Sequence, residues 1–107
     1  MSYSILVRPK AKADIREAAR WYEEQRAGLA AQFLLSVEQA MGGLRATPKM
    51  HRIVVDDIRR KLLQRFPYFL YYQVEETRVV VLGLFHTRRD PQTWQDRVDQ
   101  ENQPDDE

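Results

Sequence analysis

The chain has 107 residues, which suits one domain with one hydrophobic core. It contains no cysteine, so disulfides, thiolate metal sites and cysteine nucleophiles are excluded. The net charge of +1 hides an asymmetry: residues 45–89 carry ten Lys/Arg and four Asp/Glu, a balance of +6, whereas residues 96–107 carry one Lys/Arg and six Asp/Glu, a balance of −5.

The basic body suits an anionic partner, either nucleic acid or an acidic protein segment. On charge alone, a solvated surface is the favoured interpretation, because surface charge is common. The apolar runs are too short for a signal peptide or a membrane span, which predicts a cytoplasmic protein with no membrane partner.

The N-terminal half predicts one strand followed by two helices. Residues 3–7 carry apolar side chains at alternate positions, as in a strand, and Pro9 ends this pattern. Residues 10–26 and 29–44 each carry an apolar stripe at helical spacing, and Thr47-Pro48 ends the second helix. The link at Gly28 is very short, so the two helices should form an antiparallel hairpin.

The C-terminal half predicts strands over residues 51–55, 58–66, 68–74 and 78–85. The turns between them are short, and strands joined in this way must be antiparallel. The hairpin cannot bury its stripe alone, so it should lie on one face of the sheet. The expected fold class is α+β: an N-terminal strand and an α-helical hairpin packed on an antiparallel sheet of three or four strands.

A short C-terminal helix should follow, with Asp90 as its N-cap and Pro91 as its first residue. It should end near Val98. Residues 1–98 then form the single domain, and residues 99–107 form an acidic, flexible tail. Trp94 is expected to pack this helix back on the sheet, although it could instead stack on a ligand.

The predicted core combines the helical stripes with the alternating strand positions. It comprises Ile5, Val7, Ile15, Ala18, Tyr22, Phe33, Val37, Met41, Leu70, Tyr72, Val80 and Leu82.

The sequence has no P-loop, glycine-rich dinucleotide loop, HExxH or Gly-x-Ser-x-Gly motif, so no metal or small-molecule cofactor is expected. The remaining candidates are basic and aromatic residues of the sheet half. Such residues can hold RNA by phosphate contacts and base stacking, or hold an acidic protein segment. They can also simply solvate an open sheet. The candidate partner-binding residues are Arg59, Arg60, Arg65, Phe69, Tyr71, His86, Arg88 and Arg89.

Several segments together resemble the RelE/ParE superfamily of toxins from type II toxin–antitoxin systems, often described as plasmid-stabilisation proteins. They are Arg65-Phe66-Pro67-Tyr68, Tyr71-Tyr72-Gln73-Val74, and a Val-rich strand ending His86-Thr87-Arg88-Arg89-Asp90-Pro91. The resemblance runs from Tyr3 to Trp94. It implies a growth-inhibiting toxin that is neutralised by a cognate antitoxin, with the helix-hairpin-on-sheet fold.

The superfamily divides by target. RelE-like members cut mRNA on the ribosome with basic residues and without metal, whereas ParE-like members poison DNA gyrase. Arg60 and Arg89 match basic positions of the nucleases, but Phe69 and Leu62 stand where an arginine and a lysine are expected. The resemblance is therefore closer to ParE, and gyrase is the expected target.

Two alternatives stay open. One is a ribosome-dependent, metal-independent mRNA endoribonuclease, in which Arg60, Arg65, His86, Arg88 and Arg89 would share phosphate and proton-transfer work. The other is a non-toxic interaction module that keeps the fold.

Overall fold

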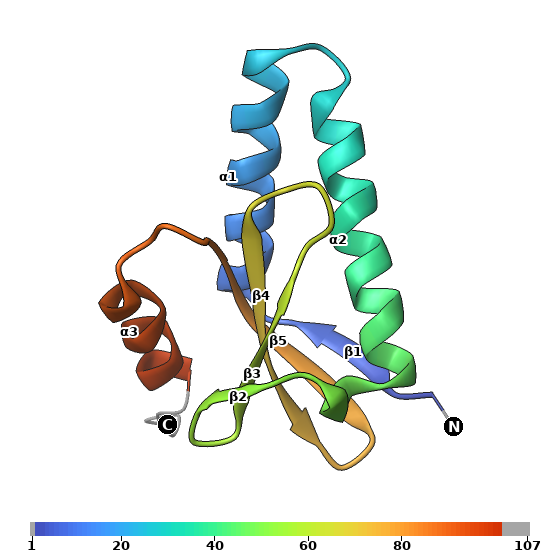
Figure 1. The fold of residues 1–107 in the computed structure, drawn as a ribbon, viewed down its shortest axis with the longest axis vertical. Coiled ribbons are helices and arrows are strands. Elements are labelled where there is room, and N and C mark those ends of the chain that lie inside the picture. Colours follow the sequence, from blue (N-terminus) through green and yellow to red (C-terminus); the bar gives the residue numbers. More distant parts are fainter. Residues whose placement is uncertain (1, 102–107) are drawn as a thin grey trace.

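The computed structural model describes residues 2–101 and is an α+β structure (Figure 1). Its elements in chain order are β1 (Ser4–Val7), α1 (Pro9–Gln25), α2 (Leu29–Ala46), the 3-10 helix η1 (Pro48–Met50), β2 (Ile53–Val55), β3 (Ile58–Leu62), β4 (Tyr68–Glu75), β5 (Arg78–His86) and α3 (Pro91–Glu101). The predicted hairpin and short C-terminal helix are therefore confirmed.

The sheet has five strands in the order β1-β5-β4-β3-β2. The pairs from β2 to β5 are antiparallel, as predicted, but β1 pairs in parallel with β5 and makes the sheet mixed. The sequence predicted an N-terminal strand and an antiparallel sheet of three or four strands, and the parallel pairing of β1 corrects that expectation. Because Ser4 pairs with Arg78, far along the chain, no local turn signal could reveal this partner.

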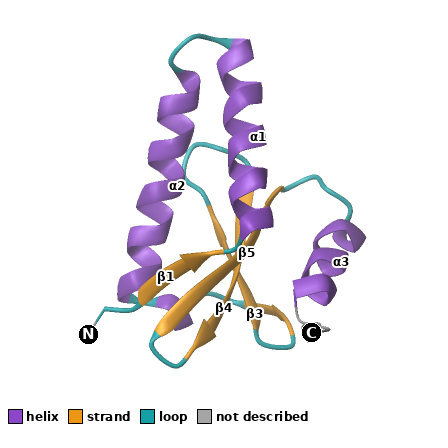
Figure 2. Ribbon diagram, turned by 180° about the vertical axis from the view of Figure 1, so that it is seen from behind, coloured by secondary structure: helices purple, strands orange, loops and turns teal. Residues whose placement is uncertain are grey.

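The two faces of the sheet are covered by different helices. The α1–α2 hairpin covers one face, and α3 lies against part of the other, as Figures 1 and 2 show from opposite sides. Each face carries its own apolar cluster. On the hairpin side, the rings of Tyr22, Phe33, Phe66 and Tyr68 pack with centroids 5.0–6.1 Å apart.

The cluster on the α3 side is built around Tyr71 and Trp94, whose rings stack with centroids 5.0 Å apart. Trp94 thus packs α3 on the sheet, as expected. Two residues of the predicted core, Val80 and Leu82, belong to this second cluster and not to the hairpin side. The predicted N-cap is also confirmed, because Asp90 Oδ1 accepts a 2.9 Å hydrogen bond from the Gln92 amide.

The apolar pattern predicted that the strand beginning at Ile58 ends at Phe66, but β3 ends at Leu62. Arg65 has a φ of 74°, in the left-handed region and outside the extended geometry of a regular strand. The loop turns Leu63 and Phe66 into the hairpin-side core, and this burial mimics the pattern of a strand.

Helix α3 continues to Glu101, three residues past the predicted end at Val98. Residues 102–107 of the acidic tail lie outside the described residues, so their expected flexibility stays a prediction. Within residues 2–101, no helix has the length and apolar character needed to cross a membrane.

Candidate partner-binding site

The basic side chains of β3 point to both faces of the sheet. Alternation sends Arg59 and Lys61 toward the hairpin, because their partners across β4 are Tyr72 and Leu70 of the hairpin-side core. Arg60 points to the α3 side, opposite Tyr71. The three adjacent cations therefore do not form one patch.

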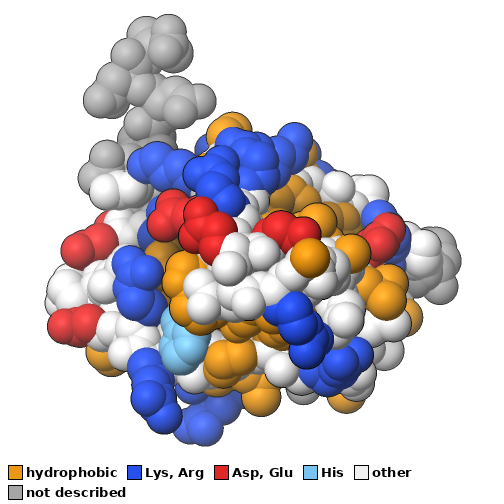
Figure 3. Space-filling view, turned by 90° about the horizontal axis from the view of Figure 1, so that it is seen from above, with side chains coloured by type: hydrophobic (Ala, Val, Ile, Leu, Met, Phe, Trp, Pro, Cys, Tyr) orange, Lys and Arg blue, Asp and Glu red, His pale blue; other side chains and the backbone are white. Residues whose placement is uncertain are grey.

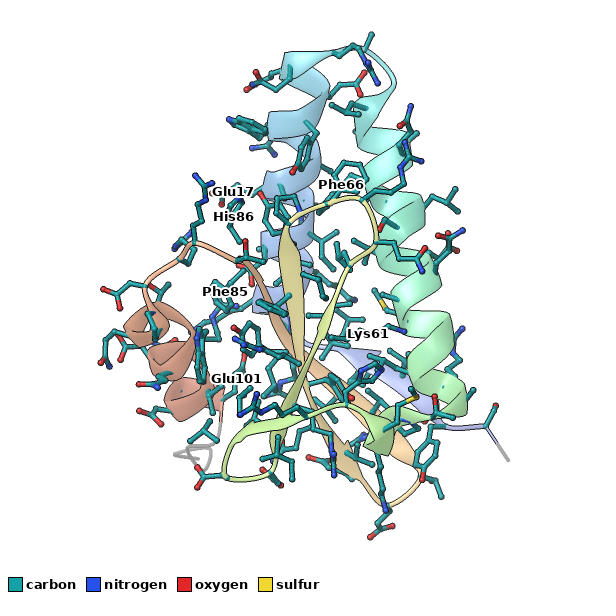
Figure 4. All side chains as sticks on the ribbon, viewed as in Figure 1. Glu17, Lys61, Phe66, Phe85, His86 and Glu101 are labelled. Atoms are coloured by element: carbon teal, nitrogen blue, oxygen red, sulfur yellow. The ribbon has the colours of Figure 1, made fainter. Side chains whose placement is uncertain are left out.

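Arg59 and Lys61 are engaged in the fold. Arg59 Nη1 donates to the carbonyl oxygens of Lys49 and His51 at 2.9 and 2.6 Å. Lys61 reaches from β3 toward α2, where its Nζ donates to the Ala40 carbonyl at 3.3 Å (Figure 4). Burial lowers the pKa of Lys61. Arg59 was predicted to contact a partner, but its guanidinium is bound to the segment before β2 by these two hydrogen bonds.

Arg60 and Arg89 lie on the two rings of a cross-strand phenylalanine pair. Phe69 of β4 is opposite Phe85 of β5. The guanidinium carbon of Arg60 is 4.0 Å from the Phe69 ring centroid, and that of Arg89 is 5.8 Å from the Phe85 centroid. These distances are those of cation–π contacts. We call these four residues, together with Leu62, the arginine–phenylalanine surface.

Leu62 is 53% exposed and pairs with Phe69, so it extends this surface as an apolar neighbour of Arg60. Tyr71 was predicted to contact a partner directly. It is only 2% exposed, because Trp94 covers its ring, and its hydroxyl accepts a 3.3 Å hydrogen bond from Arg60. Tyr71 therefore lies beneath the arginine–phenylalanine surface and helps to hold Arg60 in place through this hydrogen bond.

Two further candidates lie elsewhere. Arg65, in the loop after β3, donates to Gln32 of α2 at 3.2 Å and so belongs to the hairpin side. Arg88 is exposed in the loop after β5.

His86 lies at the end of β5, on the side opposite Phe85. It pairs with Tyr68, and the two rings meet edge to face with centroids 5.2 Å apart. Its Nδ1 accepts a 3.1 Å hydrogen bond from the Arg88 amide. This bond assigns the proton of the neutral imidazole to Nε2.

His86 lines an open groove of about 950 Å³ between α1 and α3. Arg89 is at the same rim. From α1, the groove receives Glu17, which lies beside His86 in Figure 4, and Trp21, which is 53% exposed. Figure 3, seen from above the view of Figure 1, shows cations, acids and apolar side chains interspersed over that face of the molecule.

An ion pair ties α1 to α3 along the groove. Arg97 donates to both carboxylate oxygens of Asp14, at 2.7 and 3.0 Å, and each side chain is 17% exposed. Asp14 also accepts the Leu84 amide at 3.1 Å. Gly83 makes room for the pair, because a Cβ there would lie 3.2 Å from Arg97 Nη1 and 3.3 Å from Asp14 Oδ2.

The tyrosines near the groove are poor proton acceptors. Burial raises the pKa of Tyr68, against the opposing effects of a hydrogen bond with Tyr22 and the charge of Arg89. Burial also raises the pKa of Tyr22, which lines the groove. Away from the groove, burial raises the pKa of Tyr72 to about 12. These hydroxyls stay protonated at neutral pH.

The predicted residues are thus divided. Arg60, Phe69 and Arg89 come together on the α3 side, His86 and Arg89 meet in the groove, and Arg65 is on the hairpin side. Trp21, which lines the groove, was not among the predicted residues, although a large aromatic side chain beside the helical stripe is a usable signal. The Asp14–Arg97 pair could not be predicted, because its two residues are 83 positions apart and no local pattern links them.

Solved structures similar to this chain include toxins and toxin–antitoxin complexes. The chromosomal ParDE system from P. aeruginosa matches with a TM-score of 0.71 and 17% identity, over 79% of this chain and 96% of that chain. A mutant of the E. coli toxin RelE in the free state matches with a TM-score of 0.67 and 16% identity, over 94% and 98%. The RelBE2 complex from Mycobacterium tuberculosis matches with a TM-score of 0.58 and 20% identity, over 80% and 99%.

These likenesses define the fold as that of RelE/ParE toxins. The family of the ParE toxin of the type II toxin–antitoxin system, parDE, matches residues 5–91. The chain therefore belongs to the ParE toxin family and is a type II toxin, closer to ParE than to RelE. No curated protein matches it in sequence.

Proposed function

We propose that this toxin acts by binding DNA gyrase, without cutting RNA, and that a cognate antitoxin neutralises it. The observation that carries the proposal is the position of His86. It lies on the face of β5 opposite Phe85, whereas Arg60 lies with Phe69 and Phe85 on the α3 side.

RNA cleavage without a metal needs a base for the 2′-hydroxyl, an acid for the leaving oxygen and cations on the phosphate. All of these must converge on one phosphate. Arginine is effectively always protonated, so Arg60 and Arg89 can supply charge but not proton transfer. Tyr68 has a raised pKa and makes a poor base. His86 could transfer one proton, but a second acid or base would still be needed. His86 and Arg60 also lie on opposite faces of the sheet, so they cannot act on the same phosphate.

The arginine–phenylalanine surface suits a protein partner. Arginine and aromatic side chains supply much of the binding energy of protein interfaces, especially where apolar neighbours exclude water. Here Arg60 is already stacked on Phe69, and Leu62 adds an exposed apolar side chain beside them. A preorganised arginine loses less conformational freedom on binding.

One observation favours the nuclease alternative. His86, Arg89 and Glu17 line a single groove, which brings one cation and two titratable groups together. The alternative also requires Arg60, Arg65 and Arg88, and none of these three lines the groove.

The experiment compares purified toxin in two assays: ribosomes programmed with mRNA, and gyrase with relaxed DNA as substrate for supercoiling. We expect inhibition of supercoiling, retained by His86→Ala, and intact mRNA. Cleavage of mRNA in the ribosomal A site, abolished by His86→Ala or Arg89→Ala, would establish the nuclease instead. Inactivity in both assays would favour the non-toxic module.

The antitoxin segment should carry acidic and apolar side chains, because residues 45–89 have a charge balance of +6. Its affinity should fall with added salt and fall further on Arg60→Glu. An affinity indifferent to both changes would refute the electrostatic part of this proposal.

A further inference from the structure

A row of like charges runs along the exposed side of α1. Lys12, Arg16 and Arg20 are four residues apart, and all three are exposed. Side chains at this spacing are neighbours on the surface of a helix, and two positive charges placed in this way repel each other and weaken the helix. The row therefore opposes the stability of α1.

The row lies on the side of the hairpin that faces away from the sheet. The two helices pack on the sheet through their buried stripes, and no other element of residues 2–101 covers the opposite side (Figure 2). Helical spacing places one further cation and one acid of α2 on that side. We call this side the outer face of the hairpin, and its exposed charged residues are Lys12, Arg16, Arg20, Glu24, Glu38 and Arg45.

The four cations of the outer face are not neutralised. Within residues 2–101, the salt bridges join other pairs of residues. Two acids of α1 are engaged elsewhere, because Asp14 is bound to α3 and Glu23 accepts two backbone amides at the start of α2. Against the four cations, the outer face carries only Glu24 and Glu38, so its balance is 4 − 2 = +2.

The outer face suits a phosphate backbone better than a protein. Among its described residues, Leu34 is the one large apolar side chain that is exposed, at 44%, and aromatic side chains are absent. Protein interfaces draw most of their binding energy from aromatic, apolar and arginine anchors that are buried together. A sugar-phosphate backbone is bound by exposed cations without such anchors.

The spacing of the row fits DNA. With a rise of 1.5 Å per residue, the three cations of α1 span about 12 Å along the helix. Over about that length, one strand of DNA presents three to four phosphates. The long side chains of lysine and arginine are flexible, so each can reach a phosphate of its own. Contacts of this kind carry no sequence information.

We propose that the outer face of the α1–α2 hairpin binds the sugar-phosphate backbone of double-stranded DNA, without preference for sequence. The arginine–phenylalanine surface is on the α3 side of the sheet, whereas the outer face is on the hairpin side. The toxin can therefore hold DNA and a protein partner at the same time. Only this simultaneous binding rests on the proposed function, because the DNA contact needs no gyrase.

The test measures the affinity of the full chain for a labelled DNA duplex of mixed sequence, by fluorescence anisotropy from low to physiological salt. Counterion release gives a slope of log K against log salt of about −0.9 per phosphate contacted, so three to four contacts predict a slope of about −3. Arg16→Gln and Arg20→Gln should each reduce this slope by about one. Arg52→Gln removes the same charge at an exposed site outside the outer face and should leave the slope unchanged.

Thermal unfolding separates a loss of binding from a loss of folding. Arg16→Gln relieves the repulsion by both neighbours in the row, so its melting temperature should not decrease. A wild type that does not bind DNA at low salt, or a slope that Arg16→Gln leaves unchanged, would overturn the proposal. Gyrase inhibition without DNA binding by the toxin alone would overturn this inference and leave the proposed function intact.

Two competitors identify the class of anion. Unlabelled DNA should displace the duplex, and a polyglutamate peptide of equal total charge should displace it at least tenfold less well, because its charges are less dense. Equal displacement by the peptide would overturn the proposal in favour of an acidic protein. Tighter binding of double-stranded RNA than of DNA would overturn it in favour of RNA.

Discussion

The Asp14–Arg97 pair should contribute measurably to stability, because it is the partly buried tie between α1 and α3. Arg97 makes two charge-assisted hydrogen bonds to Asp14, with each side chain 17% exposed. Hydrogen bonds to charged groups contribute about 1.5–3 kcal/mol each, and a partner left buried and unpaired adds to the loss. Allowing for partial exposure, Arg97→Met should destabilise the fold by about 2–3 kcal/mol.

The assay is urea unfolding of the wild type, Arg97→Met, Asp14→Asn and the double variant. Arg97 also packs over Phe85, with its guanidinium carbon 5.0 Å from the ring centroid. The coupling energy of the cycle isolates the ion pair from this packing, and we expect about 1.5–2 kcal/mol. Arg8→Met is the control, because the Arg8 side chain is 41% exposed in its pair with Glu101 and should cost less than about 1 kcal/mol. A coupling below about 0.5 kcal/mol would refute the reasoning.

Three further predictions concern the fold. Burial, followed by the charges of Lys61 and Arg59, lowers the pKa of His51 below its usual 6.5. The folded state therefore favours the neutral ring, so the free energy of unfolding should be highest above the unfolded pKa and should decrease as the pH drops below it. Urea midpoints measured from pH 7.5 to 5.5 check this, and the midpoint of His51→Gln should decrease less over the same range. Phe33→Ala should cost about 3–5 kcal/mol, because Phe33 is fully buried, and an unchanged denaturation midpoint would mean that its face is misassigned. Gly83→Ala should destabilise the fold by about 1–3 kcal/mol, because the added Cβ would crowd its neighbours. Gly42→Ala has open space around its Cβ and should stabilise helix α2 by up to about 1 kcal/mol. Equal changes of the melting temperature in the two variants would contradict the close approach at residue 83.

Local patterns were sufficient to predict much of the fold. The apolar stripes of α1 and α2 gave the hairpin, because helical periodicity is carried by neighbouring residues. Asp90 and Pro91 gave the start of α3 for the same reason. The parallel pairing of β1 with β5 is a contact between distant segments, which a single sequence does not encode in any local pattern.

The site was predictable only in part. The period of two along β3 places Arg60 on the other face of the sheet from Arg59 and Lys61, but it could not show that Arg59 would bind the carbonyls of an adjacent segment. The strand pattern also failed at Arg65, because buried loop residues on either side of it resemble a strand. The α1–α3 groove depends on where β1 stops beside β5, and so it could emerge only from the fold.

The most direct test of the gyrase proposal is the inhibition of DNA supercoiling by gyrase, measured against toxin concentration. The wild type should inhibit, and Arg60→Glu should shift the half-inhibiting concentration upward by at least tenfold, because it reverses the charge stacked on Phe69. Arg52→Glu, with the same charge change at an exposed site away from the arginine–phenylalanine surface, should inhibit like the wild type. Supercoiling that proceeds unchanged with excess wild-type toxin would contradict the proposal.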